Sequence, residues 1–430
     1  MSVLGELERG RLNAEDRGVL RFITAGSVDD GKSTLIGRLL HDSRQVLEDQ
    51  LASVTRASAR KGIELDLSLL TDGLEAEREQ GITIDVAYRY FASAKRKFII
   101  ADTPGHVQYT RNMVTGASTA DAAIILIDAR KGVLEQTRRH SYIAHLLGVK
   151  HILVAVNKMD LVDYAQKVFD TVRSDYLALA ERIGIQGVRF FPVSALHGDM
   201  VVERGAGMPW HRGRTLLEAL EEIQVHHDAQ NKPMRFPVQL VVRPGAGTDF
   251  RGYAGRLESG VVRVGDEVVV LPAQRNTRVR EIRSLDRSLP FAVAGDSIIL
   301  LLEDEIDISR GDMIAHHAEA ADAPRALKSL TATLCWLSAE GYSPVARYVL
   351  KHTSRSVKAK IAAIDHRVDI RSLEKQPAPE SLAMNDLAQV QLNLAQPIFA
   401  DAYAGNRTTG AFILIDEATN QTVAAGMIEA

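Results

Sequence analysis

The chain has 430 residues, of which 46% are hydrophobic and 25% charged, and its formal net charge is −3. This is ordinary globular composition, which excludes disorder, coiled coil and collagen, and the length predicts roughly three domains. The single cysteine, Cys335, excludes an internal disulfide and a zinc site of paired thiolates. We therefore expect a protein of the reducing cytoplasm. The mild charge does not favour nucleic-acid binding, and the lack of a long apolar run predicts no membrane span.

The first half of the chain alternates near-continuous apolar runs with amphipathic stretches. Such runs are typical of strands buried on both faces of a parallel sheet, and the stretches between them indicate covering helices. The pattern predicts a doubly wound α/β domain whose ligand binds at the carboxyl ends of the strands. The predicted strands are 20–25, 98–101, 123–127, 151–156 and 188–193, and the predicted helices include 33–40, 134–147 and 164–183.

The pattern of apolar and polar residues changes after about residue 225, where a helix-like stretch leads into a polar linker. Beyond it, short apolar runs separated by Gly and Pro indicate all-β barrels or sandwiches. The expected domains are a flexible N-terminal segment over 1–18, the α/β domain over 19–228, and two β-barrels over 236–322 and 325–430. The sequence leaves the conformation of the segment 41–74 open.

The first chemical motif follows the first predicted strand and opens a predicted helix. It fits G-x-x-x-x-G-K-[ST], the phosphate-binding loop (P-loop) of nucleoside triphosphatases, in the strand–loop–helix context that this motif requires. Its glycines let backbone N–H groups and a helix N-terminus meet the phosphates. Lys32 is expected to reach the β- and γ-phosphates, and the Ser33 hydroxyl to bind Mg²⁺. The motif reads Gly26-Ser27-Val28-Asp29-Asp30-Gly31-Lys32-Ser33.

A second motif, Asn157-Lys158-Met159-Asp160, ends the predicted strand 151–156. An Asp carboxylate can accept hydrogen bonds from both N1–H and the exocyclic amine of guanine, a pair that adenine does not offer. Asn157 is expected to hold N7 and the Lys158 stem to pack over the base. The next strand ends in Ser194-Ala195-Leu196, whose backbone amides are placed to meet the guanine O6. Alone, the second motif would be no more than a polar loop.

A third group of residues completes the predicted site. Asp102-Thr103-Pro104-Gly105-His106 ends the strand 98–101. Asp102 is placed to hold Mg²⁺ through water, the Gly105 N–H to sense the γ-phosphate, and His106 to orient the attacking water. Thr83 is expected to supply a further ligand to Mg²⁺.

These motifs resemble those of the translation-factor-type GTPases, the family of elongation factor Tu. The resemblance covers the whole chain, because the guanine-nucleotide motifs occur in order and two β-barrels follow. It implies that Gly31, Lys32 and Ser33 bind phosphate and Mg²⁺, that Thr83 closes over Mg²⁺, and that His106 positions water. It also implies that Asn157, Lys158 and Asp160 select guanine.

Within that family, the sequence looks most like the GTPase subunits of heterodimeric sulfate adenylyltransferases. The resemblance rests on Ser27-Val28-Asp29-Asp30, on the stretch 78–91 and on the stretch 406–416. It implies that GTP hydrolysis is coupled to adenylyl sulfate synthesis from ATP and sulfate by a small adenylyltransferase subunit, in a heterodimer or a higher assembly. Some members carry a fused adenylylsulfate kinase. We expect none here, because Ala411 stands where a second P-loop would need Lys.

Two other functions remain open. One is an elongation-factor-like GTPase that delivers aminoacyl-tRNA, and the other is a non-catalytic guanine-nucleotide switch that acts as a scaffold. Two charged segments are interpreted as structural: Lys95-Arg96-Lys97 as a solvated hairpin turn, and Arg138-Arg139-His140 as an exposed helix face. Cys335 is expected to lie in the core of a barrel strand.

Overall fold

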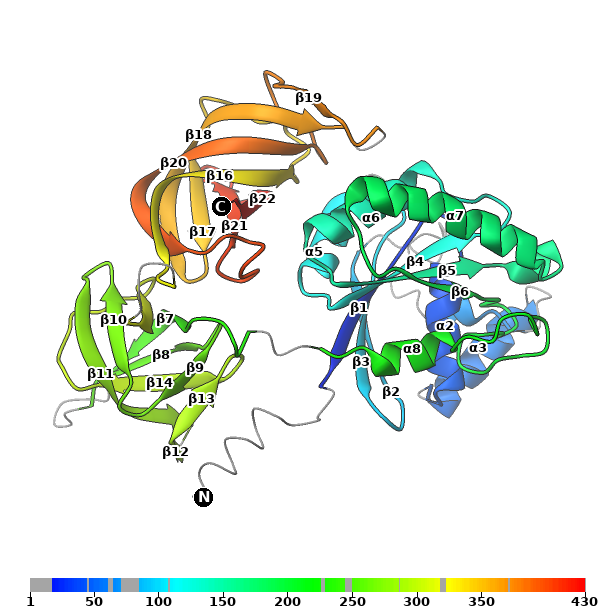
Figure 1. Ribbon diagram of the computed structural model, residues 1–430, viewed down its shortest axis with the longest axis horizontal. Coiled ribbons are helices and arrows are strands. Elements are labelled where there is room, and N and C mark those ends of the chain that lie inside the picture. The colour runs from blue at the N-terminus through cyan, green and yellow to red at the C-terminus, as the bar shows by residue number, and fades with distance from the viewer. Residues whose placement is uncertain are drawn as a thin grey trace. The chain divides into compact units, whose positions relative to one another are not determined.

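In the computed structural model, the chain divides into two compact units, one built from Asp16–Val225 and the other from His226–Asp369 and Glu374–Ala430 (Figure 1). The predicted fold class, an α/β P-loop domain followed by two all-β barrels, is confirmed. The structure describes residues 18–44, 46–60, 65–70, 85–106, 109–225, 229–243, 250–285, 287–317, 322–369 and 372–429.

A mostly parallel sheet forms the centre of the α/β unit. Its strands are β1 (Leu20–Ala25), β2 (Ala87–Ala92), β3 (Lys97–Asp102), β4 (Ala122–Asp128), β5 (His151–Asn157) and β6 (Arg189–Pro192). They are arranged in the order β2-β3-β1-β4-β5-β6, and only the β2–β3 pair is antiparallel among these neighbours. Every residue of β4 is buried, as expected for a strand covered on both faces.

Helices cover both faces of this sheet. They are α2 (Lys32–Asp42), α3 (Glu48–Arg60), α5 (Thr110–Ser118), α6 (Glu135–Leu146), α7 (Gln166–Ile183) and α8 (Leu216–Glu222), with 3-10 turns at Leu67–Leu70 and Met159–Val162. Figure 1 shows α5, α6 and α7 on one face, and α2 and α8 on the other. Helix α8 begins with a capping box, in which the Thr215 hydroxyl accepts from the Glu218 N–H and Glu218 accepts from the Thr215 N–H. Helix α3 lies within the segment 41–74, whose conformation the sequence left open.

The turn between β2 and β3 differs from its predicted character. Residues 95–97 do connect two strands, but Arg96 is only 5% exposed instead of being solvated. Its guanidinium donates to the Gly18 carbonyl at 3.1 Å and to the carbonyl of Ile223, beyond the end of α8. Lys95 forms an ion pair with Glu221 at 2.8 Å. The basic run therefore ties the hairpin to α8, since buried guanidinium donors require acceptors.

The first barrel begins after the linker. Its main strands are β7 (Arg235–Val242), β8 (Gly252–Arg256), β10 (Glu267–Leu271), β11 (Arg275–Ser284), β14 (Ser297–Leu302) and β15 (Met313–His316), with the short β9 (Val261–Arg263), β12 (Arg287–Leu289) and β13 (Phe291–Val293). The sheet closes because β10 pairs with both β15 and β11. Alternate inward side chains form one apolar core.

The second barrel is closed by the pairing of β17 with β18. Its strands are β16 (Arg325–Trp336), β17 (Tyr348–His352), β18 (Arg355–Val368), β20 (Leu387–Ala400), β21 (Ala411–Asp416) and β22 (Thr422–Ile428), with the short β19 (Lys375–Pro377) beside β18. Trp336 lies in its core, and Cys335 beside it is buried as predicted. Burial raises the pKa of the Cys335 thiol to about 12, so the thiolate does not form at neutral pH.

A buried ion pair joins the two barrels. The Arg235 guanidinium, 4% exposed, donates to both Asp401 carboxylate oxygens, from Nε at 3.0 Å and from Nη2 at 2.8 Å. Nη2 also donates to the Asp322 carbonyl at 2.8 Å, and Thr409 donates its hydroxyl proton to Asp401. Apolar side chains from both barrels pack together nearby, namely Leu271, Met313 and Phe399. The barrels are thus fixed to each other by a bidentate, largely desolvated contact.

None of the helices in the described ranges is both long and apolar enough to cross a membrane.

We expect Asp401→Asn to lower the free energy of unfolding of the barrels by about 3–5 kcal/mol, because it leaves the Arg235 charge buried without its counter-ion. The matched control is Glu267→Gln, which breaks an exposed ion pair with Arg278 and should cost less than about 1 kcal/mol. Urea unfolding followed by the fluorescence of Trp336, in a Trp210→Phe background, measures both. Equal losses in the two variants would show that the Arg235–Asp401 contact is not what holds the barrels.

Candidate functional site

The predicted motifs meet at one edge of the parallel sheet. The P-loop follows β1, the segment 103–106 follows β3, the Asn-Lys-Met-Asp motif spans the end of β5, and Ser194-Ala195-Leu196 follows β6. Because these strands are parallel, their carboxyl ends lie at the same edge, where α/β sheets bind ligands. Thr83 lies outside the described residues.

Two glycines of the P-loop stand where no other residue fits. Gly31 precedes α2 with φ of +93°, and a Cβ there would lie 2.5 Å from the Asn157 side-chain nitrogen. Gly26 has φ of +149°, and a Cβ there would lie 2.7 Å from the Leu126 carbonyl oxygen. Both the backbone conformation and the available space therefore require glycine. The loop carries the chain directly into the N-terminus of α2.

Lys32 lies inside the curve of this loop. Its side chain is 7% exposed, and its ammonium donates to the Ser27 carbonyl at 2.8 Å and to the Gly26 carbonyl at 3.2 Å. Burial lowers the pKa of Lys32, while Asp102 and Asp30 act in the opposite direction. A Cβ on Gly105 would lie 2.5 Å from Lys32 Nζ. The turn after β3 thus approaches the ammonium as closely as a residue without a side chain allows.

Asp102, at the end of β3, is held by its neighbour on β1. The two strands place Thr24 beside Asp102, and the Thr24 hydroxyl donates to Asp102 Oδ1 at 3.1 Å. Thr103 in turn donates its hydroxyl proton to the Thr24 carbonyl at 2.6 Å. Ser33 lies in the first turn of α2. Asp102, Thr103, Pro104 and Gly105 are buried, whereas His106 is exposed, with its ring centroid 6.4 Å from that of Tyr109.

The buried Asn157 side chain connects three loops. Its amide nitrogen donates to the Asp30 carbonyl of the P-loop at 2.8 Å, and its amide oxygen accepts from the Ala195 N–H at 3.0 Å. Arg38 of α2 supports the same third loop, donating to the carbonyls of Ala195, at 3.1 Å, and of Leu196. The Asn157 amide, which the sequence analysis expected to hold the base, therefore also holds the P-loop and the loop after β6 in place.

Lys158 and Asp160 are oriented by separate partners. Ser194 donates its hydroxyl proton to Asp160 Oδ1 at 2.7 Å, which leaves the second carboxylate oxygen for another donor. The Lys158 ammonium donates to the Asp29 carbonyl and lies 3.1 Å from Asp128 Oδ2. Leu196 is 53% exposed on the same edge, and Met159 between the two polar side chains is fully buried. The predicted guanine-binding residues thus lie together, joined to the P-loop.

The interpretation of residues 138–140 as an exposed helix face is wrong for His140. This side chain is 1% exposed on α6, and its Nδ1 accepts a hydrogen bond from the Gly26 N–H at 3.1 Å. Burial, together with the positive charges of Lys32 and Arg139, lowers the pKa of His140 to about 3. The ring is therefore neutral, and its Nδ1 holds the backbone of Gly26, the first residue of the P-loop. The Gly26 partner lies 114 residues away in sequence, so no local pattern could reveal it.

Sequence reasoning also missed Arg38 and Asp128. Nothing in the pattern of α2 distinguishes Arg38 from a surface residue of a helix. Asp128 did leave a signal, since a carboxylate that ends a fully apolar strand at the binding edge calls for a counter-ion.

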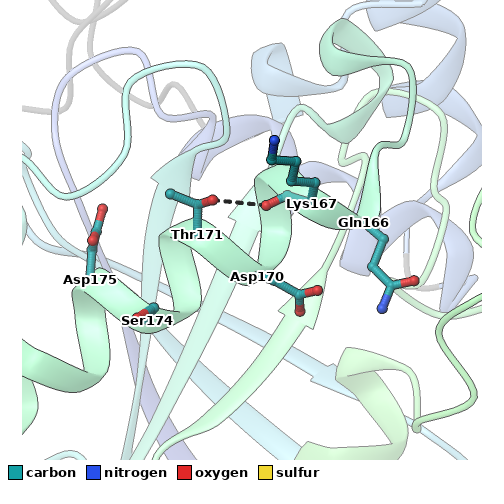
Figure 2. Close-up of a pocket in the computed structure, with 6 residues that line it drawn as sticks. All are labelled: Gln166, Lys167, Asp170, Thr171, Ser174 and Asp175. Atoms are coloured by element: carbon teal, nitrogen blue, oxygen red, sulfur yellow. Dashed lines mark hydrogen bonds between the residues drawn. The ribbon is translucent and has the colours of Figure 1, made fainter.

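The hollow along α7 is a different feature. It has a volume of about 620 Å³ and is lined by Gln166, Lys167, Asp170, Thr171, Ser174 and Asp175. Figure 2 shows these side chains spread along one helix, with a hydrogen bond of 2.9 Å from the Thr171 hydroxyl to the Lys167 carbonyl. All six residues are exposed and none of them belongs to a predicted motif. This surface has the character of a solvated helix face, and the predicted motifs lie elsewhere, at the sheet edge.

The comparisons with known families agree with this geometry. A model of the elongation factor Tu GTP-binding domain matches residues 17–225, and a model described as GTP-eEF1A C-terminal domain-like matches residues 329–429. The fold and the site therefore define a GTP-binding protein of the elongation factor Tu type.

Individual relatives show to which group within this family the chain belongs. Sulfate adenylyltransferase subunit 1 of Cellvibrio japonicus is 52% identical over 436 residues, covering 100% of this chain and 91% of the relative. The subunit 1 of Chromobacterium violaceum is 53% identical, covering 97% and 87%. A bifunctional enzyme CysN/CysC of Rhodopirellula baltica is 52% identical, covering 96% of this chain and 64% of that enzyme. The chain belongs to the sulfate adenylyltransferase subunit 1 family.

The buried neutral His140 predicts a specific loss of stability in acid. In the unfolded chain an ordinary histidine binds a proton below about pH 6.5, whereas folded His140 stays neutral to about pH 3. Between these values the unfolded state binds more protons, so His140 costs about 1.4 kcal/mol of stability per unit fall in pH, or about 2 kcal/mol from pH 6.5 to 5. His140→Asn, which keeps an acceptor at the Nδ1 position, should remove this loss.

Urea unfolding at pH 7 and pH 5 measures the effect, with Trp210 of the α/β unit as the fluorescent probe in a Trp336→Phe background. The control is His140→Leu, which also cannot titrate but leaves the Gly26 N–H without its acceptor. Both variants should lose the His140 share of the pH dependence, about 2 kcal/mol between pH 6.5 and 5, and only His140→Leu should weaken nucleotide binding. An unchanged pH dependence in both variants would contradict the assignment.

The orientation of Asp160 predicts base selectivity. Asp160→Asn should weaken GTP binding by about a hundredfold or more and favour xanthosine triphosphate, because the xanthine C2 carbonyl needs a donor where guanine needs an acceptor. Competition binding with the two nucleotides measures the preference. The exposed Asp163→Asn, three residues further along, should change nothing. If Asp160→Asn kept the preference for guanine, Asp160 would not be the residue that recognises the base.

Proposed function

We propose that this chain is the GTP-hydrolysing subunit of a sulfate adenylyltransferase. It couples GTP hydrolysis to the formation of adenylyl sulfate and diphosphate from ATP and sulfate, and a separate small subunit carries out the adenylyl transfer. The observation that carries the proposal is the 52% identity to sulfate adenylyltransferase subunit 1 across the whole chain. The designation "subunit 1" of these relatives implies a partner subunit. Coupling is needed because the phosphate–sulfate anhydride is a high-energy bond.

The side chains and backbone that line the P-loop are suited to a bound nucleoside triphosphate, and the neighbouring residues to guanine. The Ser27 hydroxyl is buried and has no hydrogen-bond partner among the described residues. A buried hydroxyl without a partner is costly, and a phosphate oxygen would accept its proton. The backbone around Gly31 and Gly105 leaves no space for side chains but admits the close approach of a ligand. Asn157, Lys158 and Asp160 would then receive the guanine base.

Ser33, Asp102 and Thr83 are the residues that would hold Mg²⁺. The described part of the chain contains no group of three or more His, Cys, Asp or Glu side chains able to bind a metal. This fits Mg²⁺, which is usually held by one or two carboxylates, waters and the phosphates of the substrate. When bound, the ion neutralises the charge that develops on the phosphate oxygens.

The chain's own residues position the phosphates and the attacking water and stabilise the negative charge on the phosphates. Lys32 places its ammonium against the β- and γ-phosphates, and the Gly105 N–H donates to the γ-phosphate. His106, at the exposed end of the same turn, orients the attacking water. Because the P-loop is already fixed by Asn157 and His140, these donors need little reorganisation as the reaction proceeds. The lone buried Cys335 takes no part and is consistent with a protein of the cytoplasm.

The test is reconstitution of the chain with its small partner subunit, ATP and sulfate. Adenylyl sulfate formed with GTP should exceed that formed with a non-hydrolysable analogue by at least about tenfold, which corresponds to 1.4 kcal/mol of coupled free energy. His106→Ala should lower GTP turnover by about a hundredfold with GTP affinity kept. The exposed His317→Ala is the control and should leave both unchanged. Equal product with GTP and the analogue would refute the coupling.

GTP turnover and a filter-binding experiment separate the two other functions considered. A scaffold would show no GTP turnover for His106→Ala to remove. An elongation-factor-like role would appear as tight, GTP-dependent retention of aminoacyl-tRNA on a filter. The GTP-binding domain is shared with elongation factor Tu, but the full-length relatives at 52–53% identity are sulfate adenylyltransferase subunits.

A further inference from the structure

Asp128 ends β4 directly beside the guanine-binding residues. The β4–β5 register pairs Asp128 with Asn157, and the Ala129 N–H donates to the Asn157 carbonyl at 2.9 Å. The Asp128 side chain is completely buried. A carboxylate in such a position is retained only when it is neutralised and hydrogen-bonded, so its partners indicate what it does.

Two cations share this carboxylate. Arg130 grips both oxygens, with Nε 3.0 Å from Oδ1 and Nη2 2.7 Å from Oδ2, and its backbone N–H also donates to Oδ1 at 3.0 Å. Lys158 Nζ lies 3.1 Å from Oδ2. Burial by itself would raise the pKa of Asp128, but the hydrogen bonds from Arg130 and Lys158 hold it well below its usual range. The bidentate grip of Arg130 fixes the plane of the carboxylate.

The contact with Asp128 fixes the conformation of the Lys158 side chain. Its backbone is left-handed, with φ of +62°, and its ammonium is held between Asp128 and the Asp29 carbonyl of the P-loop. A lysine side chain with a free end samples many rotamers, and ordering it costs up to about 2 kcal/mol. Here the end of the chain is already anchored, so the aliphatic stem is in place before a base arrives.

We propose that Asp128 is a positioning residue of the guanine site. It fixes the Lys158 stem against one face of the base and, through the Lys158–Asp29 contact, links base binding to the P-loop. Arg130 holds Asp128 in the required orientation. The inference rests on the proposed assignment of Lys158 to the base, and it goes further by naming what preorganises that residue.

The test is a double-mutant cycle on the dissociation rate of N-methylanthraniloyl-GDP from the full chain. Asp128→Asn and Lys158→Ala should each speed dissociation by about tenfold, and the double variant should be no more than about twofold faster than either one, because both remove the same interaction. Arg130→Ala is the intermediate case. It removes the group that orients Asp128 but leaves the Asp128–Lys158 pair in place, so dissociation should speed up by at most about threefold.

The outcomes distinguish a failure of the role proposed for Asp128 from a failure of the assignment of Lys158 to the base. If Lys158→Ala left the dissociation rate unchanged, the base assignment itself would fail. If Lys158→Ala acted but Asp128→Asn did not, or if the two effects multiplied, Asp128 would have only a structural role. Asp128→Glu keeps the charge but moves it by one methylene group. It should fold and still speed dissociation, which keeps the test decisive if Asp128→Asn is unstable.

Discussion

One buried side-chain amide, that of Asn157, determines how the site is assembled. Its two hydrogen bonds, to the Asp30 carbonyl and from the Ala195 N–H, join loops from three different strands. An amide is suited to this place because it offers a donor and an acceptor on one rigid plane. The same contact explains Gly31, since any side chain there would collide with the Asn157 nitrogen. The loops proposed to bind the phosphates and the base therefore form one preorganised structure.

The sequence predicts the fold class and the meeting of the motifs well, and the reason is physical. Near-continuous apolar runs imply strands covered on both faces, and parallel strands bring their carboxyl ends to one edge. Motifs that follow such strands must then lie together, as Lys32, Asp102 and Asp160 do. The glycine spacing of the P-loop could also be predicted, because it reflects backbone geometry that depends on few distant contacts. Thr83 remains a prediction, since it lies outside the described residues.

The supporting residues could not be predicted in the same way. His140 and Arg96 stand in runs of charged residues, and a local pattern assigns such runs to the surface. Their burial depends on acceptors and donors supplied from far along the chain, at Gly26 for His140 and at Ile223 for Arg96. Only the three-dimensional structure shows these partners. Asp128 is intermediate, because a carboxylate that ends an apolar strand is unusual enough to suggest a role without revealing it.

The contact between the barrels has a consequence for recognition. Arg235 and Asp401 meet through two parallel hydrogen bonds with little access to water, and this geometry resists both rotation and sliding. The two barrels therefore keep a fixed mutual orientation. A protein that binds only one of them orients the other as well. For partner recognition, the second half of this chain is a single rigid surface that crosses a domain boundary.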